Sequence, residues 1–227
     1  MKKALIVINP NSTQSLTDGI AAALEPLHSF GIPIRCLTLA EGPPGIETQQ
    51  QADLTIAPML ARAKREEPNA LGYVIACFSD PGLYALRDGT ALPVLGIQEA
   101  AMMTAMTLGQ AVGVIAIKPA SITRHMRAFG AMGVSGRIAG ERALGLSVTA
   151  LTGDGTLDAM IATGRALRDE DGAEVLIMGC AGMARYRDPL EQALGIPVVE
   201  PCQAAASMAL GRIALNQSHK ITGATDA

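Results

Sequence analysis

Short apolar runs alternate along the chain with longer segments whose apolar residues recur at helical spacing. The apolar runs predict strands at Ala4–Ile8, Ile34–Leu39, 71–76, Pro93–Ile97, Val112–Ile117, Ser147–Leu151, Val175–Met178 and Pro197–Val199. The segments between them predict helices that end near His28, Glu67, Arg87, Gly109, Arg168 and Leu194, one that begins at Lys118–Ser121, and a last helix at Gln203–Asn216. Alternating strands and helices are typical of an α/β fold whose parallel strands are joined by right-handed crossovers.

The second half of the chain repeats the order of elements in the first. Ile6–Ser12 matches Val114–Ser121, Ile34–Thr38 matches Val148–Thr152, Cys77 matches Cys180, and Pro93–Ala101 matches Pro197–Ala205. Four matches in the same order indicate a duplicated unit. We therefore predict two similar three-layer domains, each with a four-stranded parallel sheet, related by a pseudo-two-fold with the active site between them. The first lobe would comprise residues 1–102, completed by a C-terminal helix at 206–220, and the second lobe residues 103–205.

Composition and charge narrow the class of protein. Hydrophobic residues make up 49% of the chain, and the net charge is −3 with no stripe of basic side chains, so we expect no nucleic-acid partner. No apolar segment has the length of a membrane span, and the apolar run that ends before Asn9 is too short for a signal peptide. We expect a cytoplasmic protein with a small-molecule substrate and no membrane partner. A homo-oligomer is also expected, of a size that the sequence does not indicate.

The motifs of the common cofactor and metal sites are missing. None of the four cysteines lies in a CxxC or Cys/His ligand spacing, so we expect no metal. No GxGxxG follows a strand, and neither a Walker A motif nor a GxSxG occurs, which disfavours nucleotide binding and serine hydrolysis. We therefore expect chemistry that needs no cofactor.

Cys77 and Cys180 each follow an apolar run at equivalent places in the two halves. A single cysteine at a strand end is most often a small buried hydrophobe. Packing would not require cysteine in both halves, however, and parallel sheets bind ligands beyond the carboxyl ends of their strands. We expect Cys77 and Cys180 to face each other across one cleft, where a strand-to-helix position could lower a thiol pKa. One thiolate could then remove a proton from a carbon acid while the other thiol returns one to the opposite face.

The enolate formed by such a proton transfer needs hydrogen-bond donors at its oxygen. We predict substrate contacts from Asn9, Asn11, Ser12, Thr13, Ser79, Asp80, Lys118, Ala181, Gly182 and Met183. We interpret Cys36 and Cys202 as packing residues. His125 is interpreted as a surface or packing residue, and the charge run that it forms with Arg124 and Arg127 as a solvated face.

Five stretches of the chain resemble the hydantoin racemase family, which includes allantoin racemases and lies within the aspartate/glutamate racemase superfamily. They are Ile8–Thr13, Gly42–Glu47, Ala76–Leu83, Gly96–Ala101 and Gly179–Met183, and the resemblance covers nearly the whole chain. It implies a cofactor-independent enzyme of two α/β domains in which Cys77 and Cys180 are catalytic.

The residues that follow each cysteine indicate the chemical class of the substrate. Amino-acid racemases of the superfamily typically have Cys-Asn-Thr and Cys-Thr-His, whereas this chain has Cys77-Phe-Ser79 and Cys180-Ala-Gly182. The side chains expected to hold an ammonium and a carboxylate are missing, which favours a neutral or weakly acidic ring. Ser79 stands where the family often has Asp, and Lys118-Pro119 where it usually has a Thr-containing sequence.

The sequence thus predicts a racemase that inverts C5 of 5-monosubstituted hydantoins or of allantoin. Several alternatives remain open. Within the superfamily these are an amino-acid racemase, a cis–trans isomerase and a decarboxylase, the last of which needs only one catalytic cysteine. A non-catalytic two-lobed binding protein would need no reactive thiol, and a redox pair would need the two cysteine Cα atoms within about 7 Å.

Overall fold

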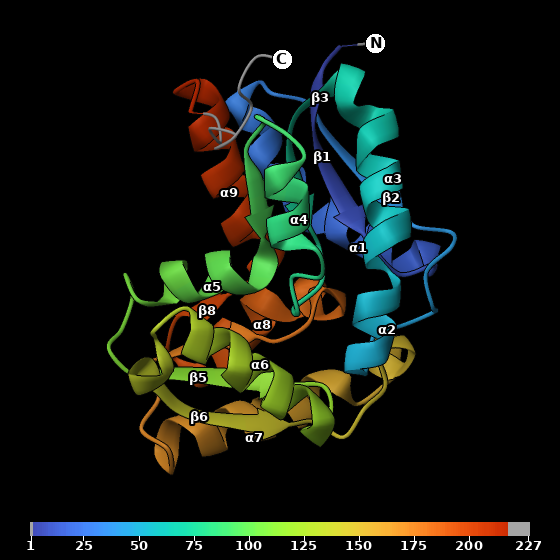
Figure 1. Cartoon of the computed structure of the whole chain (residues 1–227). Helices are drawn as coiled ribbons and strands as arrows, with labels where there is room; N and C mark the ends of the chain where they lie inside the picture. The colour runs from blue at the N-terminus through green and yellow to red at the C-terminus, as the bar shows by residue number, and fades with distance from the viewer. Residues whose placement is uncertain (1, 218–227) are drawn as a thin grey trace.

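The computed structural model describes residues 2–217 and has two four-stranded parallel sheets, one above the other in Figure 1. The first sheet has the order β2-β1-β3-β4, and its strands are β1 Ala4–Asn9, β2 Ile34–Thr38, β3 Ala70–Ile75 and β4 Val94–Gly96. The second has the order β6-β5-β7-β8, with β5 Val112–Ala116, β6 Ile138–Ala143, β7 Val175–Met178 and β8 Val198–Val199. The same strand order in both sheets confirms the predicted α/β fold with two four-stranded parallel sheets.

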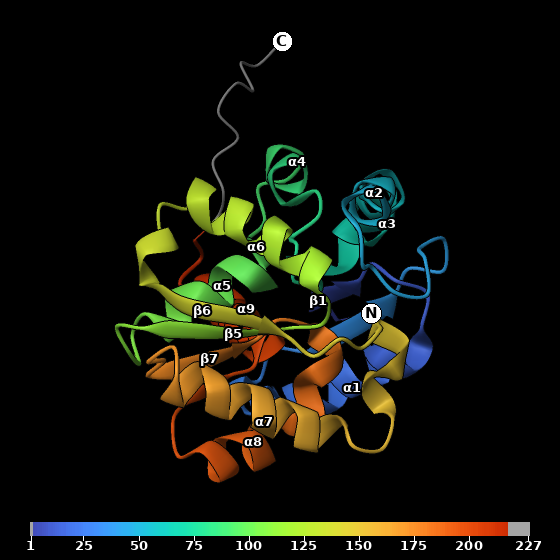
Figure 2. The same ribbon diagram turned by 90° about the horizontal axis from the view of Figure 1, so that it is seen from below.

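Helices cover both faces of each sheet, as Figure 2 shows for the second sheet between α6 on one side and α7 with α8 on the other. The α-helices are α1 Gln14–Leu24, α2 Gln49–Leu54, α3 Ile56–Glu66, α4 Leu83–Asp88, α5 Ile97–Ala105, α6 Pro119–Ala131, α7 Thr156–Asp169, α8 Arg187–Leu194 and α9 Pro201–Ala214. Short 3-10 helices include η4 Val148–Thr152 and η5 Ala181–Tyr186. Among residues 2–217, no helix combines the length and apolarity that crossing a membrane requires.

Strand alternation divides the apolar residues of β1 between two cores. Ala4, Ile6 and Ile8 pack in a cluster with residues of α3 and α4, whereas Leu5 and Val7 pack on the other face with residues of α1 and α9. Every residue of β1 is buried because both faces of the sheet are covered. This explains why the strand is a continuous apolar run in the sequence.

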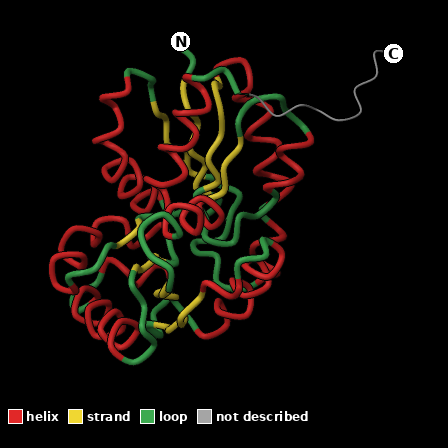
Figure 3. The backbone as a smooth tube through the Cα atoms, turned by 90° about the vertical axis from the view of Figure 1, so that its left-hand side faces the viewer, coloured by secondary structure: helices red, strands yellow, loops and turns green. Residues whose placement is uncertain are grey.

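One hydrophobic cluster is shared by the two sheets. Val7 from β1 and Val114 from β5 belong to the same buried cluster, together with residues of α5 and α9. Helix α9 follows β8 in the chain but packs against β3, β4 and β1 of the first sheet, and Figure 3 shows the two sheets held together by helices between them. The lobe boundaries at 102/103 and 205/206 stay a prediction, and the last part of the predicted helix 206–220, residues 218–220, lies outside the described residues.

The prediction of a strand at Ser147–Leu151 is wrong. That segment forms the 3-10 helix η4, whose start is capped by the Ser147 hydroxyl accepting the N–H of Ala150. The strand equivalent to Ile34–Thr38 is Ile138–Ala143, paired with β5. It was missed because Glu141 and Arg142 interrupt its apolar pattern, whereas Val148–Leu151 is apolar enough to imitate a strand.

The helix predicted to end near Glu67, which would begin at about Glu47, is also divided in the structure. Helix α2 begins at Gln49, behind a capping box made by Thr48 and Gln51, and ends at Leu54. Helix α3 starts at Ile56 after a break at Thr55. The break leaves α2 as a separate short segment near the second half of the molecule, as Figure 1 shows.

Gly179, the residue before Cys180, is a position where substitution should disturb the second sheet. Its N–H donates to the carbonyl of Ile115 at 2.9 Å, and a Cβ placed on it would lie 2.7 Å from that same oxygen. We expect Gly179→Ala to destabilise the fold by about 1–3 kcal/mol, the usual cost of overpacking. Urea unfolding followed by circular dichroism measures the change.

The matched control is Ala76→Gly, at the equivalent position before Cys77. The Ala76 N–H donates to the carbonyl of Ile8 at 2.8 Å, so this position already accommodates a methyl group. The substitution should cost only about 0.5–1 kcal/mol of backbone entropy. Equal losses for the two variants would contradict the steric explanation for Gly179.

Candidate active site

Cys77 and Cys180 line the same cavity between the two sheets. Cys77 follows β3 after Ala76, and Cys180 follows β7 after Gly179. The rest of the wall is mixed, with apolar side chains such as Leu16 beside polar ones. Side chains from both halves of the chain form this wall, among them Ile46 and Ile117.

Each cysteine sulfur receives the backbone N–H of the residue two positions later in the chain. Ser79 N–H donates to Cys77, and Gly182 N–H donates to Cys180. Burial, followed by the charge of the neighbouring Cys180, nevertheless raises the pKa of Cys77 to about 12. Burial likewise raises the pKa of Cys180 to about 11. The expected lowering of a thiol pKa is therefore wrong, because desolvation outweighs the two N–H donors.

Asn9 and Asn11 from the first half are held in a hydrogen-bond network at the cavity wall. The Asn9 side-chain amide donates to Asn11 Oδ1 and to Thr17 Oγ1, both at 3.0 Å. Asn11 N–H donates back to Asn9 Oδ1 at 3.3 Å. Both asparagines are buried and line the cavity, so their side chains are fixed before a substrate arrives. Ser79, Ala181 and Gly182 also line the cavity, as the sequence predicted.

Ser12, Thr13 and Asp80 belong to the loops that support the cavity. Ser12 N–H and the Thr13 hydroxyl donate to the carbonyls of Pro43 and Pro44 at 3.0 and 2.7 Å. Asp80 has a positive φ of 43°, and its carboxylate accepts the N–H groups of Gln98 and Glu99 at the start of α5. Burial raises the pKa of Asp80 to about 7. These contacts fix the chain after Asn11 and after Cys77.

Lys118 and Met183 are likewise engaged away from the cavity wall. Met183 is fully buried in the cluster with α7 and α8. The Lys118 ammonium pairs with the carboxylate of Glu47, which also accepts the N–H of Val148 at 2.9 Å. Although burial opposes ionisation, the hydrogen bonds from Lys118 and Val148 keep the pKa of Glu47 below its usual value. Glu47 thus ties the loop before α2 to the second half of the molecule.

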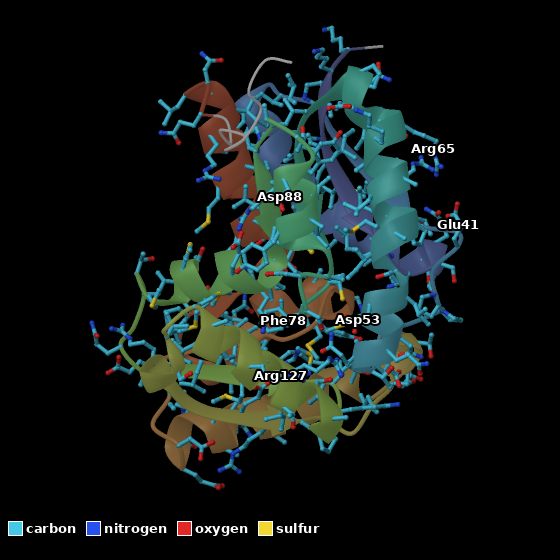
Figure 4. The ribbon with its side chains drawn as sticks, viewed as in Figure 1. Glu41, Asp53, Arg65, Phe78, Asp88 and Arg127 are labelled. Carbon is cyan, nitrogen blue, oxygen red and sulfur yellow. The ribbon has the colours of Figure 1, made fainter. Side chains whose placement is uncertain are left out.

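Arg124 and His125 lie at the cavity wall, so interpreting them as part of a solvated face is wrong, whereas His125 is buried and packed, as one of its two interpretations expected. Their exposed fractions are only 8% and 2%. His125 Nδ1 bonds to the carboxylate of Glu141 on β6, and its ring meets Phe78 edge to face at a centroid distance of 4.9 Å. Figure 4 labels Phe78 where the two halves meet and Arg127 on α6. The sequence signal was the helical phase, which separates the buried residues 121, 124 and 125 from exposed Arg127.

The family model for Asp/Glu/hydantoin racemases matches residues 5–209 of the chain. The chain belongs to the Asp/Glu/hydantoin racemase family. It is 33% identical over 217 residues to the hydantoin racemase of Paenarthrobacter aurescens, which covers 93% of this chain and 91% of that protein. It is 34% identical over 207 residues to the hydantoin racemase of Rhizobium meliloti, covering 89% of this chain and 86% of that protein.

Among solved structures, this member of the racemase family is similar to the allantoin racemase from Klebsiella pneumoniae. The TM-score is 0.92 with 29% sequence identity, covering 98% of this chain and 92% of the other. The family resemblance recognised in the sequence motifs is thereby confirmed. The similarity extends over both sheets, and so over both strands that lead to the cavity cysteines.

Proposed function

We propose that the protein is a racemase that inverts C5 of hydantoin-type rings, 5-monosubstituted hydantoins or allantoin, through Cys77 and Cys180. The observation that carries the proposal is that both cysteines, at equivalent strand ends of the two sheets, line one cavity. Racemisation needs one base and one acid on opposite faces of the reacting carbon, and two thiols from two halves supply both. The relatedness to hydantoin racemases supports the substrate class.

In this mechanism one cysteine, as thiolate, removes the C5 proton, and the electron pair moves onto the adjacent ring carbonyl to form an enolate. The other cysteine, as thiol, then protonates C5 from the opposite face. After the turnover the two sulfurs have exchanged protonation states. Burial raises the pKa of both thiols and therefore lowers the fraction of each that is ionised. The same high pKa makes the thiolate, once formed, a stronger base toward the C5 proton.

The enolate oxygen needs fixed donors at the moment charge develops on it. Asn11 and Ser79 line the cavity and carry such groups. Asn9 donates both of its amide hydrogens to Asn11 and Thr17, and so holds the Asn11 side chain in place. The backbone N–H of Ser79 stabilises a thiolate at Cys77, and the backbone N–H of Gly182 stabilises a thiolate at Cys180. All of these donors belong to the chain itself, and the mechanism has no step that requires a cofactor.

The direct test is racemisation by the purified protein. Separate enantiomers of alkyl hydantoins, aryl hydantoins and allantoin are incubated with the protein and no added cofactor, and optical rotation is followed with time. We expect rotation to decay to zero from both enantiomers, with deuterium entering at C5 in D₂O. Aspartate and glutamate are the comparison substrates. Racemisation of these amino acids, with none of the rings, would overturn the proposed substrate class.

A further inference from the structure

One face of α6 presents three polar side chains to the cavity that holds the cysteines. Ser121, Arg124 and His125 occupy positions i, i+3 and i+4 of the helix, and all three line the cavity. All three are buried, and Arg124 has an exposed fraction of only 8%. This set, a hydroxyl, a guanidinium and an imidazole, is well suited to binding an anion.

The hydrogen bonds of the Arg124 guanidinium go only to neutral acceptors. They are the Glu47 carbonyl at 2.7 Å, the Ala120 carbonyl at 3.4 Å and the Ser121 hydroxyl at 3.3 Å. Its Nε is buried and has no hydrogen-bond partner among the described residues. A buried charge is normally paired with an opposite one, so this guanidinium offers both a charge and an unused donor to an anionic ligand.

The two carboxylates whose charges act on Arg124, those of Glu47 and Glu141, bond to other groups. The Glu47 carboxylate is bonded to Lys118 and to the N–H of Val148. The Glu141 carboxylate is bonded to His125 Nδ1, and its second oxygen is buried without a partner. Within residues 2–217, the Nε2 of His125 has no hydrogen-bond partner, so this nitrogen is available to a ligand at the cavity wall.

We propose that Ser121, Arg124 and His125 form a subsite for a carboxylate carried by the substrate. The inference rests on the proposed function, and it names the substrate class: hydantoin-type rings whose C5 side chain ends in a carboxylate. The ring lies between the cysteines, and its side chain extends toward α6 beside Phe78. Arg124 binds the carboxylate through its charge, the Ser121 hydroxyl donates a hydrogen bond that fixes its orientation, and His125 forms the neighbouring wall.

The Cys77 thiolate is the other anion that could pair with Arg124, but it is not present in the resting site. The Arg124 charge favours that thiolate, yet burial and the Cys180 sulfur keep the pKa of Cys77 at about 12. Near neutral pH the thiol is therefore protonated and leaves the guanidinium unpaired. A substrate carboxylate supplies the opposite charge, so the protein should prefer hydantoins with acidic side chains over neutral ones.

The test compares 5-(2-carboxyethyl)hydantoin with its neutral isostere, 5-(2-carbamoylethyl)hydantoin, in wild-type protein and in Arg124→Gln. We expect wild type to prefer the acid, by about 10²-fold in kcat/KM, and Arg124→Gln to lose that preference, since a truncated buried charge contact costs affinity of this order. The kcat/KM for the amide should fall by a smaller factor than that for the acid, because loss of the Arg124 charge disfavours the Cys77 thiolate with both substrates but removes a charge partner only from the acid. Arg124→Lys should restore part of the preference because it keeps the charge but loses the fork geometry.

Arg127→Gln is the matched control. Arg127 lies on the same helix and donates to Gln49 across the two halves at 2.8 Å, but its side chain is exposed and outside the cavity. The Arg127→Gln variant measures the effect of losing an arginine contact between the two halves. It should keep the wild-type preference for the acid over the amide. Circular dichroism and thermal unfolding establish that each variant is folded.

Calorimetric titration of both compounds into a Cys77→Ser/Cys180→Ser protein, with and without Arg124→Gln, separates binding from chemistry. If the acid binds more tightly than the amide and this difference is lost in Arg124→Gln, the subsite is supported. This holds even if wild type racemises neither compound, an outcome that would contradict the proposed racemase function but not the subsite. An equal loss for acid and amide in Arg124→Gln would overturn the subsite, because Arg124 would then act on the thiol or the enolate. Equal binding of both compounds to the unmutated subsite would also overturn it.

Discussion

Cys77→Ser and Cys180→Ser should each abolish racemisation, with a loss of at least about 10³-fold in kcat for both enantiomers. Each thiol is the only acid or base on its face of C5 in this mechanism, and a positioned acid or base contributes about 10²–10⁴-fold. A serine hydroxyl cannot replace it, because its pKa is far too high to supply a base. Polarimetry with separate enantiomers measures the loss.

Hydrogen exchange in D₂O gives a sharper result with the same variants. The remaining thiolate can still remove the C5 proton of the one enantiomer that presents it, and return a deuteron to the same face. We therefore expect each variant to exchange one enantiomer without inverting it, and the two variants to select opposite enantiomers. Exchange of the same enantiomer by both variants would contradict the opposed arrangement of Cys77 and Cys180.

Cys36→Ser is the matched control for these substitutions. Cys36 lies on β2, pairs in register with Val7, and is a free cysteine away from the cavity that holds the other two. Its replacement tests whether the loss of a thiol outside the cavity is enough to reduce activity. The variant should racemise at the wild-type rate. Inactivity of a folded Cys36→Ser variant would contradict the assignment, because loss of activity would then not be specific to the two cavity cysteines.

The second large effect is a steep rise of activity with pH. Burial raises the pKa of Cys77 to about 12 and that of Cys180 to about 11, so both thiols are protonated near pH 7. Because the reaction starts from a thiolate, kcat/KM should rise about tenfold per pH unit from pH 7 to pH 10, following the ionisation of one thiol of the pair. An N3-methylated hydantoin removes the ionisation of the substrate itself, and the non-enzymatic rate at each pH is subtracted.

Protein stability limits how far this profile can be followed. The folded thiols hold their protons to a higher pH than the unfolded chain, where cysteine titrates near about 8.5. Between that pH and the folded pKa values of about 11 and about 12, the folded state binds more protons, so its free energy of unfolding falls as pH rises. Circular dichroism at each pH identifies the folded range. A plateau of kcat/KM below pH 8 in folded protein would contradict the raised thiol pKa values.

The order of elements could be predicted from the sequence wherever a strand is buried on both faces. β1 and β7 are continuous apolar runs because helices cover both sides of their sheets. β6 could not be predicted in the same way, since it is an edge strand of half-buried residues with Glu141 and Arg142 at its centre. Its pairing with β5 is decided by tertiary contacts, among them the bond between Glu141 and His125.

By itself, the sequence determined the duplicated α/β architecture and the equivalence of Cys77 and Cys180, because hydrophobic periodicity and repeat order are local properties of the chain. It also determined that Asn9, Asn11 and Ser79 lie at strand ends. Only the tertiary structure decided which way the thiol pKa values shift, since desolvation depends on the atoms that two distant segments bring around each sulfur.

Which charged side chains line the cavity was likewise decided by the tertiary structure. Arg124 and His125 belong to a segment of mixed polarity that resembles a solvated helix face, and they become part of the wall because α6 lies between the second sheet and the first half of the molecule. Arg124, which the sequence suggests is at the surface, is instead a buried cation without a carboxylate partner among the described residues. The physical reason is the same for thiols and guanidinium: a side chain's charge state and partners depend on what packs around it, which no stretch of sequence specifies alone.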